Sequence, residues 1–332
     1  DKPVYLILCH QTMKIMTCMG SAEAKKKKIK KPKLYKSQWS DILEGLCDGQ
    51  RLMVVVDEWH KLHHARDLFT SLFAQPKRCK ALLMTGTEHP TKTYRSTLGK
   101  ENADIIKNAR KTGGVTMSEG IQFGYIVGAH VETVYATDAA TGEAVDCKDT
   151  PLGARAKQVA AWMVANSIRT AVCYCKSITQ TDAFVPLLEA ALVEASGGLR
   201  AWCRPVHSGK ACKGKNRTLD EFKKPKTRAE DPDYRVVVSV DMLKEGYDFA
   251  GLEACVLLAI PPSSGGLMQV IQRCMRADGK KAVGRVLLVG TDRDGGNVAG
   301  LLHQHDPKWE HISLGATPGT LQGYADLAAN NA

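Results

Sequence analysis

The chain has 332 residues, 44% of them hydrophobic and 24% charged, and its formal net charge is +11. This is the composition of a globular protein with room for two ordinary domains, without the proline or glycine bias of fibrous or low-complexity chains. Because no apolar run approaches the roughly 18–20 residues of a membrane span, and the start lacks a signal-peptide cleavage site, we expect no membrane partner and an intracellular location, cytoplasm or nucleus.

The cysteines and the basic segments narrow the class of protein further. Most of the eleven cysteines lie in strand-like or helix-like runs, as Cys173, Cys175 and Cys255 do, which indicates reduced, buried thiols rather than a zinc site. Positive charge is concentrated in three blocks, Lys25–Lys33, Lys210–Arg217 and Lys223–Arg228. Such blocks are usually solvated loops, but together they favour a polyanionic partner.

Short apolar runs rich in β-branched residues alternate with helical patterns along the chain. The predicted strands are Val4–Cys9, Leu52–Val56, Ala81–Thr85, Thr170–Cys175, Leu199–Pro205, Arg235–Val240, Ala254–Ile260 and Arg285–Val289. The predicted helices are Trp39–Leu46, His63–Ala74, Arg155–Asn166, Thr179–Glu194 and Leu267–Arg276. Because the strands are continuously apolar, we expect them to be buried on both faces, in parallel sheets covered by helices.

The alternation falls into two blocks, which predicts an α/β protein with two domains. We place the first domain at residues 1–110, a connector at 111–150 and the second domain at 151–332. The connector contains one alternating segment, Ile121–Ala136, which we expect to form an antiparallel or edge strand. The last forty residues carry no clear motif, and a C-terminal helix packed on the second domain is the default expectation.

Four stretches of the sequence contain residues suited to catalysis or ligand binding. VVVDEWH (54–60) ends an apolar strand on two carboxylates, and LLMTGT (82–87) ends another strand on Thr-Gly-Thr. The segment 236–258 contains KEGYDF, and QVIQRCMR (269–276) contains two arginines three residues apart. Each motif is weak alone, but their order and spacing together are specific.

In this order the stretches resemble the motifs of superfamily 2 helicases of the DExH-box type, among them the translocases of restriction enzymes. Asp57–His60 resembles motif II, Thr85–Thr87 motif III, Ala171–Ser177 the start of motif IV, Ser239–Phe249 motif V and Gln269–Arg276 motif VI, while Leu6–Met13 lies where motif Ia belongs. The resemblance implies two RecA-like parallel-sheet domains, the first incomplete at its N-terminus. Gln272 departs from the pattern, because motif VI usually has glycine there.

The resemblance also implies a set of site residues, with Mg²⁺ and ATP as cofactors. The catalytic set is Asp57, Glu58, His60, Arg273 and Arg276, with Asp57 and Glu58 also at the metal; Gln269, Gly246 and Asp248 are expected at the nucleotide. The set expected at nucleic acid, DNA or RNA, is Cys9, His10, Gln11, Thr85, Gly86, Thr87, His207, Gly209, Ser239 and Lys244.

Physical chemistry agrees with these roles. Phosphoryl transfer needs positioning and charge neutralisation more than covalent help from the protein. A carboxylate at the end of a strand, such as Asp57, suits the hard cation Mg²⁺, and Glu58 could orient the attacking water. The alternatives are a strand that simply ends in a polar turn and, for the arginines, a surface pair on an amphipathic helix.

The phosphate-binding loop GxxxxGK[ST] is not found in the sequence, and only five residues precede Leu6. Three explanations remain open: the chain is a fragment, another polypeptide supplies the loop, or ATP hydrolysis has been lost. Two functions are therefore carried forward, a nucleic-acid-dependent ATPase and a helicase-like binding or scaffold subunit without turnover. A dinucleotide-binding enzyme is disfavoured, because no GxGxxG follows a strand.

Overall fold

The computed structural model describes residues 52–56, 79–83, 100–101, 104–105, 115–134, 136–137, 144–145, 150–209, 212, 214–240, 243, 249–261, 264–290 and 292–315. The chain divides into two compact units, residues 1–114 and 115–332. In the first unit, strands β1 (Leu52–Val56) and β2 (Cys79–Leu83) pair in parallel, with Leu52 opposite Cys79. The predicted bounds of the first strand are confirmed, whereas the second begins two residues earlier than predicted.

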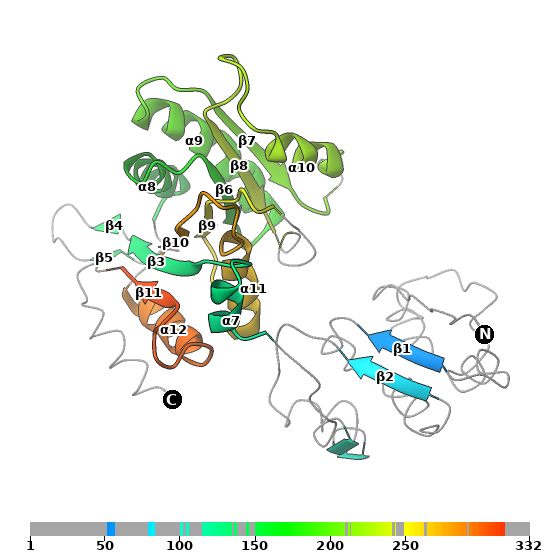
Figure 1. The fold of residues 1–332 in the computed structure, drawn as a ribbon. Coiled ribbons are helices and arrows are strands. Elements are labelled where there is room, and N and C mark those ends of the chain that lie inside the picture. The colour runs from blue at the N-terminus through cyan, green and yellow to red at the C-terminus, as the bar shows by residue number, and fades with distance from the viewer. Residues whose placement is uncertain are drawn as a thin grey trace, which may run out of the picture. The chain divides into compact units, whose positions relative to one another are not determined.

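The second unit is built on a seven-stranded sheet in the order β11-β3-β10-β9-β6-β8-β7, in which every neighbouring pair is parallel (Figure 1). The strands are β3 (Gly128–Val134), β6 (Thr170–Tyr174), β7 (Ala201–Val206), β8 (Tyr234–Ser239), β9 (Ala254–Leu257), β10 (Val283–Val289) and β11 (Ile312–Leu314). A separate antiparallel ribbon joins β4 (Ala136–Thr137) to β5 (Ala144–Val145). The predicted parallel α/β architecture is therefore confirmed.

Helices cover both faces of this sheet. On one face lie α8 (Leu152–Ala165) and α9 (Ile178–Ala195); on the other lie α10 (Lys215–Lys223), α11 (Ser264–Cys274) and α12 (Asp292–His303), with the short α7 (Met117–Gln122) beside them. Successive side chains of a strand point to opposite faces of the sheet and enter different hydrophobic cores. Val172 of β6 packs in the core under α11 and α12, and Cys173 packs in the core under α8 and α9. This two-sided burial explains why the strands are continuously apolar.

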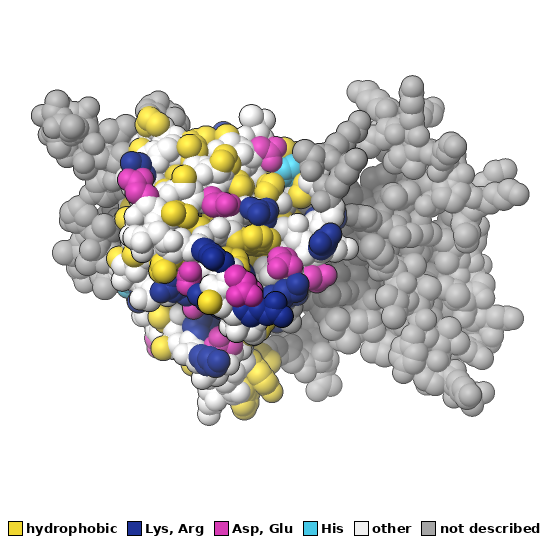
Figure 2. All heavy atoms as spheres, turned by 90° about the horizontal axis from the view of Figure 1, so that it is seen from above, with side chains coloured by type: hydrophobic (Ala, Val, Ile, Leu, Met, Phe, Trp, Pro, Cys, Tyr) yellow, Lys and Arg dark blue, Asp and Glu magenta, His cyan; other side chains and the backbone are white. Residues whose placement is uncertain are grey.

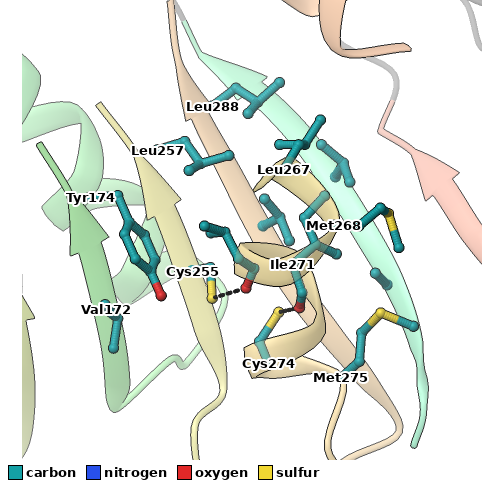
Figure 3. Close-up of a cluster of buried hydrophobic side chains, with 14 of the residues drawn as sticks. Val172, Tyr174, Cys255, Leu257, Leu267, Met268, Ile271, Cys274, Met275 and Leu288 are labelled. Carbon is teal, nitrogen blue, oxygen red and sulfur yellow. Dashed lines mark hydrogen bonds between the residues drawn. The ribbon is translucent and has the colours of Figure 1, made fainter. Parts of the chain in front are cut away.

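Figure 3 shows the core beneath α11. Leu267 and Ile271 point from the helix onto β9 and β10, where they meet Leu257 and Leu288. The thiol of Cys255 donates to the carbonyl of Val270 at 3.3 Å. Burying these side chains removes apolar surface from water on both partners, so α11 is held against the sheet along its length.

The cysteines behave as the sequence predicts. Cys173, Cys175, Cys203, Cys255 and Cys274 are buried free thiols. Burial raises the pKa of the Cys175 thiol to about 11, and burial also raises the pKa of the Cys173 and Cys203 thiols. These thiols are core-filling groups with little thiolate at neutral pH.

One strand expectation is wrong. We expected Ile121–Ala136 to be an antiparallel or edge strand, but Ile121 belongs to α7, and β3 pairs in parallel with both β10 and β11 inside the sheet. The alternating pattern has another cause: Ala129 and Val131 face a core, whereas Glu132, on the other face, stays partly exposed. The segment thus folds with the second unit.

The end of the chain contains both an expected and an unexpected element. The default of a C-terminal helix is confirmed by α12, whose Val298 and Leu302 enter the core. The sequence did not reveal β11, which is only three residues long and pairs with β3. Asp306 fixes the approach to β11 by accepting hydrogen bonds from the backbone N–H groups of His311 and Ile312.

Strand β7 lies at the border of the described sheet, and its outer backbone groups are already used. The N–H of Cys203 donates to the Glu189 carboxylate at 3.0 Å, and the Cys203 carbonyl accepts from Arg204 at 2.7 Å. The next outward-facing residue, Pro205, has no N–H, and its carbonyl accepts from the Cys212 thiol at 3.2 Å. A further strand could therefore not form hydrogen bonds with these backbone groups of β7.

We therefore predict that the double variant Glu189→Ala, Pro205→Val self-associates, because it exposes two backbone N–H groups on a flat strand border. Sedimentation velocity over a range of concentrations would show the dimer. The matched control is Lys157→Ala, Glu194→Ala, which removes a surface ion pair with both side chains 69% exposed and should leave the mass unchanged. Equal sedimentation masses for the two double variants would contradict the prediction.

Candidate functional site

The parallel sheet separates the described site residues into two groups. All its strands begin at one end, here called the amino end of the sheet, and finish at the other, the carboxyl end. His207 follows the last residue of β7, and Ser239 is the last residue of β8, so both lie at the carboxyl end. Arg276 precedes β10 and lies at the amino end. Helix α11 joins the parallel neighbours β9 and β10, so it returns from the carboxyl end to the amino end.

The amino-end group is built on α11. Its buried residues form the core-facing side of the helix, while Gln269, Gln272 and Arg273 lie partly exposed on the other side. Arg273 occupies the last turn, where a cation is favoured by the partial negative charge of the helix C-terminus. Gln269 is one turn earlier on the same face, as expected from the spacing of four residues.

The expected geometry of the two arginines is partly wrong. The helix predicted over Leu267–Arg276 would place Arg273 and Arg276 on one face, but α11 ends at Cys274, and Arg276 forms a β-bridge with Ile126. The extended segment is fixed by hydrogen bonds from Val127 N–H to the Met275 carbonyl, 2.6 Å, and from Ala277 N–H to the Tyr125 carbonyl, 3.2 Å. Both arginines still lie at the amino end of the sheet, on consecutive stretches of backbone.

A close approach of two backbones marks the end of α11. A Cβ added at Gly284 of β10 would lie 2.6 Å from the Cys274 carbonyl oxygen, so only glycine permits this packing. The last turn of α11 is therefore pinned directly against β10. This contact sets where the helix stops and where the chain toward Arg276 begins.

At the carboxyl end, His207 is held by two hydrogen bonds. Its Nδ1 lies 3.0 Å from the backbone nitrogen of Gly209, and its Nε2 lies 2.9 Å from the Asp182 carboxylate on α9. Because a peptide N–H can only donate, Nδ1 accepts, and the ring proton must be on Nε2, donating to Asp182. The His207 side chain is 1% exposed.

Two expectations at this end are corrected. His207 and Ser239 were expected at nucleic acid, but both residues are buried, at 2% and 0% exposure, so their side chains do not reach the surface. Gly209 was also expected there, but its backbone N–H, the group that could meet a phosphate, is already donated to His207. The exposed residue of this loop is Ser208, which lies between them.

The basic block Lys223–Arg228 is largely compensated. Lys224 pairs with Glu221 at 2.8 Å, and Lys226 pairs with Asp233 at 2.5 Å. The hydrogen bond from Lys226 lowers the pKa of the Asp233 carboxyl. Figure 2 shows acidic and basic side chains interspersed on the face that it presents, rather than a patch of one sign. The block therefore adds less to polyanion binding than its sequence suggests.

The other expected residues lie outside the described part of the chain. These are Cys9, His10, Gln11, Asp57, Glu58, His60, Thr85, Gly86, Thr87, Lys244, Gly246 and Asp248. Strand β1 ends at Val56, immediately before Asp57. Among the residues that the structure describes, no group of three or more His, Cys, Asp or Glu side chains is arranged to hold a metal ion. No helix in this part is long and apolar enough to cross a membrane.

Sequence reasoning missed Asp182 and the β-bridge of Arg276. Asp182 is a single carboxylate on a helix and lies 25 residues from His207, so no local pattern could pair them. The bridge joins Ile126 and Arg276, which are far apart in sequence, so no local pattern could show that they pair. Both contacts depend on tertiary packing alone.

The fold and site define a RecA-like α/β domain of the kind that helicases contain. Residues 156–278 match the family model described as the helicase conserved C-terminal domain. Over these residues the second unit is therefore similar to a helicase C-terminal domain, which agrees with the helicase resemblance of the sequence motifs in this part of the chain. No curated protein matches the sequence.

Solved structures agree on the fold. A fragment from Vibrio vulnificus YJ016 described as the HsdR subunit of a type I restriction enzyme is 17% identical, with a TM-score of 0.55 over 79% of this chain and 47% of that one. The Type ISP restriction-modification enzyme LlaBIII, bound to DNA, is 14% identical, with a TM-score of 0.56 over 96% and 24%. The Mycobacterium smegmatis helicase Lhr, bound to ssDNA and AMP-PNP, is 16% identical, with a TM-score of 0.50 over 96% and 36%. The chain spans less than half the length of each.

We predict that Gly209→Ala destabilises the fold by about 1–3 kcal/mol, because the new Cβ would lie 2.8 Å from Nδ1 of His207, a buried ring that Asp182 also holds. Urea unfolding would measure the change. The control is Gly153→Ala in α8, where an added Cβ meets nothing within 4 Å and alanine favours the helix. Equal midpoints for the two variants would contradict the prediction.

Proposed function

We propose that this chain works as a nucleic-acid-dependent ATPase of superfamily 2, a helicase or translocase that uses ATP and Mg²⁺ to move on or remodel DNA or RNA. The observation that carries the proposal is the exposed side of α11 within a helicase C-terminal domain. Gln269 and Arg273 lie on it, and Arg276 follows at the same end of the sheet.

Arg273 and Arg276 are suited to neutralising the negative charge of a phosphate group. A guanidinium stays charged at all physiological pH values and matches phosphate oxygens with several N–H donors. During phosphoryl transfer, negative charge spreads over the equatorial oxygens of the transferred group. Arg273 and Arg276, at the amino end of the sheet, are proposed to contact those oxygens, with Gln269, Gly246 and Asp248 beside the nucleotide.

The remaining catalytic roles are proposed for residues that follow β1. Mg²⁺ would neutralise phosphate charge, and Asp57 is the proposed ligand because carboxylate oxygens suit this cation. Glu58, also placed near the metal, is proposed to orient the attacking water, and His60 to link this site to the Thr85–Thr87 segment. The position of Asp57 directly after a parallel strand supports this, since ligands bind beyond the carboxyl ends of such strands.

Nucleic acid is proposed to bind at the carboxyl end of the second sheet, where Gly209 and the exposed Ser208 lie. Cys9–Gln11, Thr85–Thr87 and Lys244 are proposed as further contacts with it. Backbone phosphate contacts position a strand without reading its sequence, so DNA and RNA both fit. Two of the similar structures were solved with DNA or ssDNA, which supports a polynucleotide partner.

A second candidate is a helicase-like nucleic-acid-binding or scaffold subunit without turnover. The lysine-rich block Lys25–Lys33 favours it, because polyanion binding alone would explain such charge. The two candidates differ in one observable, the hydrolysis of ATP.

The test is Mg²⁺-ATP hydrolysis with and without single- and double-stranded DNA and RNA, using the 332-residue chain and any longer natural form. We expect polynucleotide-stimulated turnover that Glu58→Gln abolishes and that Arg276→Ala lowers by about a thousandfold, since arginines that neutralise transition-state charge have effects of this order. Arg228→Ala is the matched control: this arginine is 74% exposed in a surface pair with Glu230, so turnover should not change.

Turnover that survives Glu58→Gln would contradict the assignment of this carboxylate. If neither form hydrolyses ATP while both retain nucleic acid, the ATPase proposal fails and the binding subunit is supported.

A further inference from the structure

Hydrogen bonds and packing hold the loop that follows β7. His207 takes the Gly209 N–H, and the Cys212 N–H donates to the Gly209 carbonyl at 3.1 Å. The Cys212 thiol reaches back to the Pro205 carbonyl. A Cβ at Gly209 would also lie 3.5 Å from the end of Ile178, so the loop packs on the first turn of α9. The backbone of Ser208 and Gly209 is therefore held in place.

Asp182 of α9 contacts this loop through the His207 ring. It lies one helical turn after Ile178, on the same side of α9. Its carboxylate is 44% exposed, whereas the ring that it binds is 1% exposed. By accepting the Nε2–H of His207, Asp182 fixes the ring tautomer that leaves Nδ1 free to accept the Gly209 N–H.

We propose that Asp182 and His207 are positioning residues, which hold the Ser208–Gly209 backbone so that the exposed Ser208 hydroxyl contacts a phosphate of the bound nucleic acid. This rests on the proposed function. Neither Asp182 nor the His207 ring touches the ligand; they fix the loop before binding, so that less conformational entropy is lost when the phosphate arrives.

The arrangement explains the burial of a polar ring beside a surface loop. A buried imidazole needs partners for both nitrogens, and His207 has them, at 2.9 and 3.0 Å. Lys176, at the end of β6 beside α9, is exposed, and its N–H donates to the Gln180 side chain. An exposed cation after β6 and an exposed hydroxyl after β7 thus both lie at the carboxyl end of the sheet, which suits a phosphate more than an apolar group.

Side-chain substitutions separate the two contacts of the ring. His207→Asn places an amide oxygen near the position of Nδ1, so it can still accept the Gly209 N–H. His207→Gln places its amide near the position of Nε2, so it keeps the contact with Asp182 only. Asp182→Asn retains an oxygen that can accept the Nε2–H, and Asp182→Ala does not. Asp220→Ala is the control, an exposed carboxylate on α10 with the same charge change.

Binding of a labelled single-stranded DNA and an RNA of the same sequence is measured by fluorescence anisotropy at fixed salt, with thermal unfolding of each variant in parallel. We expect Asp182→Ala and His207→Gln to weaken binding by about fivefold to tenfold, as loss of one ordering hydrogen bond predicts. His207→Asn and Asp182→Asn should stay within about twofold of the unmodified chain. Ser208→Ala should match the loss in Asp182→Ala.

The tautomer provides an independent readout. With ¹⁵N-labelled histidine, His207 should show a protonated Nε2 and an unprotonated Nδ1, and Asp182→Ala should disturb this signature. Equal binding by His207→Asn and His207→Gln, or losses that only follow unfolding, would overturn the positioning role. Failure of the unmodified chain to bind either oligonucleotide would instead overturn the proposed function and, with it, the phosphate contact.

Discussion

The parallel direction of all seven strands in the second unit is the constraint on which its functional geometry depends. In a parallel sheet every connection must return across a face, so helices cover both sides and all strands finish at the same end. Residues that directly follow strands gather at the carboxyl end, as His207 does. Residues at the end of a returning helix gather at the amino end, as Arg273 does. Two separate groups of residues result, one at each end of the sheet.

Much of this architecture was readable from the sequence, because two-sided burial imposes continuous apolar runs. The limits of β1 were predicted without error, and β6 and β8 to within one residue at each end. The direction of β3 was not readable. Its alternating burial arises because polar residues such as Glu132 lie on one face, and pairing direction leaves no trace in such a pattern. The three-residue β11 is too short to show any period.

The site was predicted less completely than the fold. The helix that carries Gln269 and Arg273 was expected, but the end of α11 was not, since it depends on Gly284 packing against the Cys274 carbonyl. Likewise, the sequence placed His207 and Gly209 at nucleic acid but cannot show that the histidine ring is turned inward. That orientation requires Asp182, supplied by another element of the fold. Charge was also misjudged, because Lys224 and Lys226 meet acidic partners only after folding.

We propose that nucleic acid and nucleotide bind at opposite ends of the second sheet. Hydrogen–deuterium exchange of the whole chain, with a single-stranded oligonucleotide or with Mg²⁺-ADP, tests it directly. We predict that the oligonucleotide slows exchange in the segments around Lys176–Asp182 and His207–Cys212, whereas the nucleotide slows exchange around Arg273–Lys281. Protection of the Arg273–Lys281 segment by the oligonucleotide, with none around His207, would contradict this arrangement.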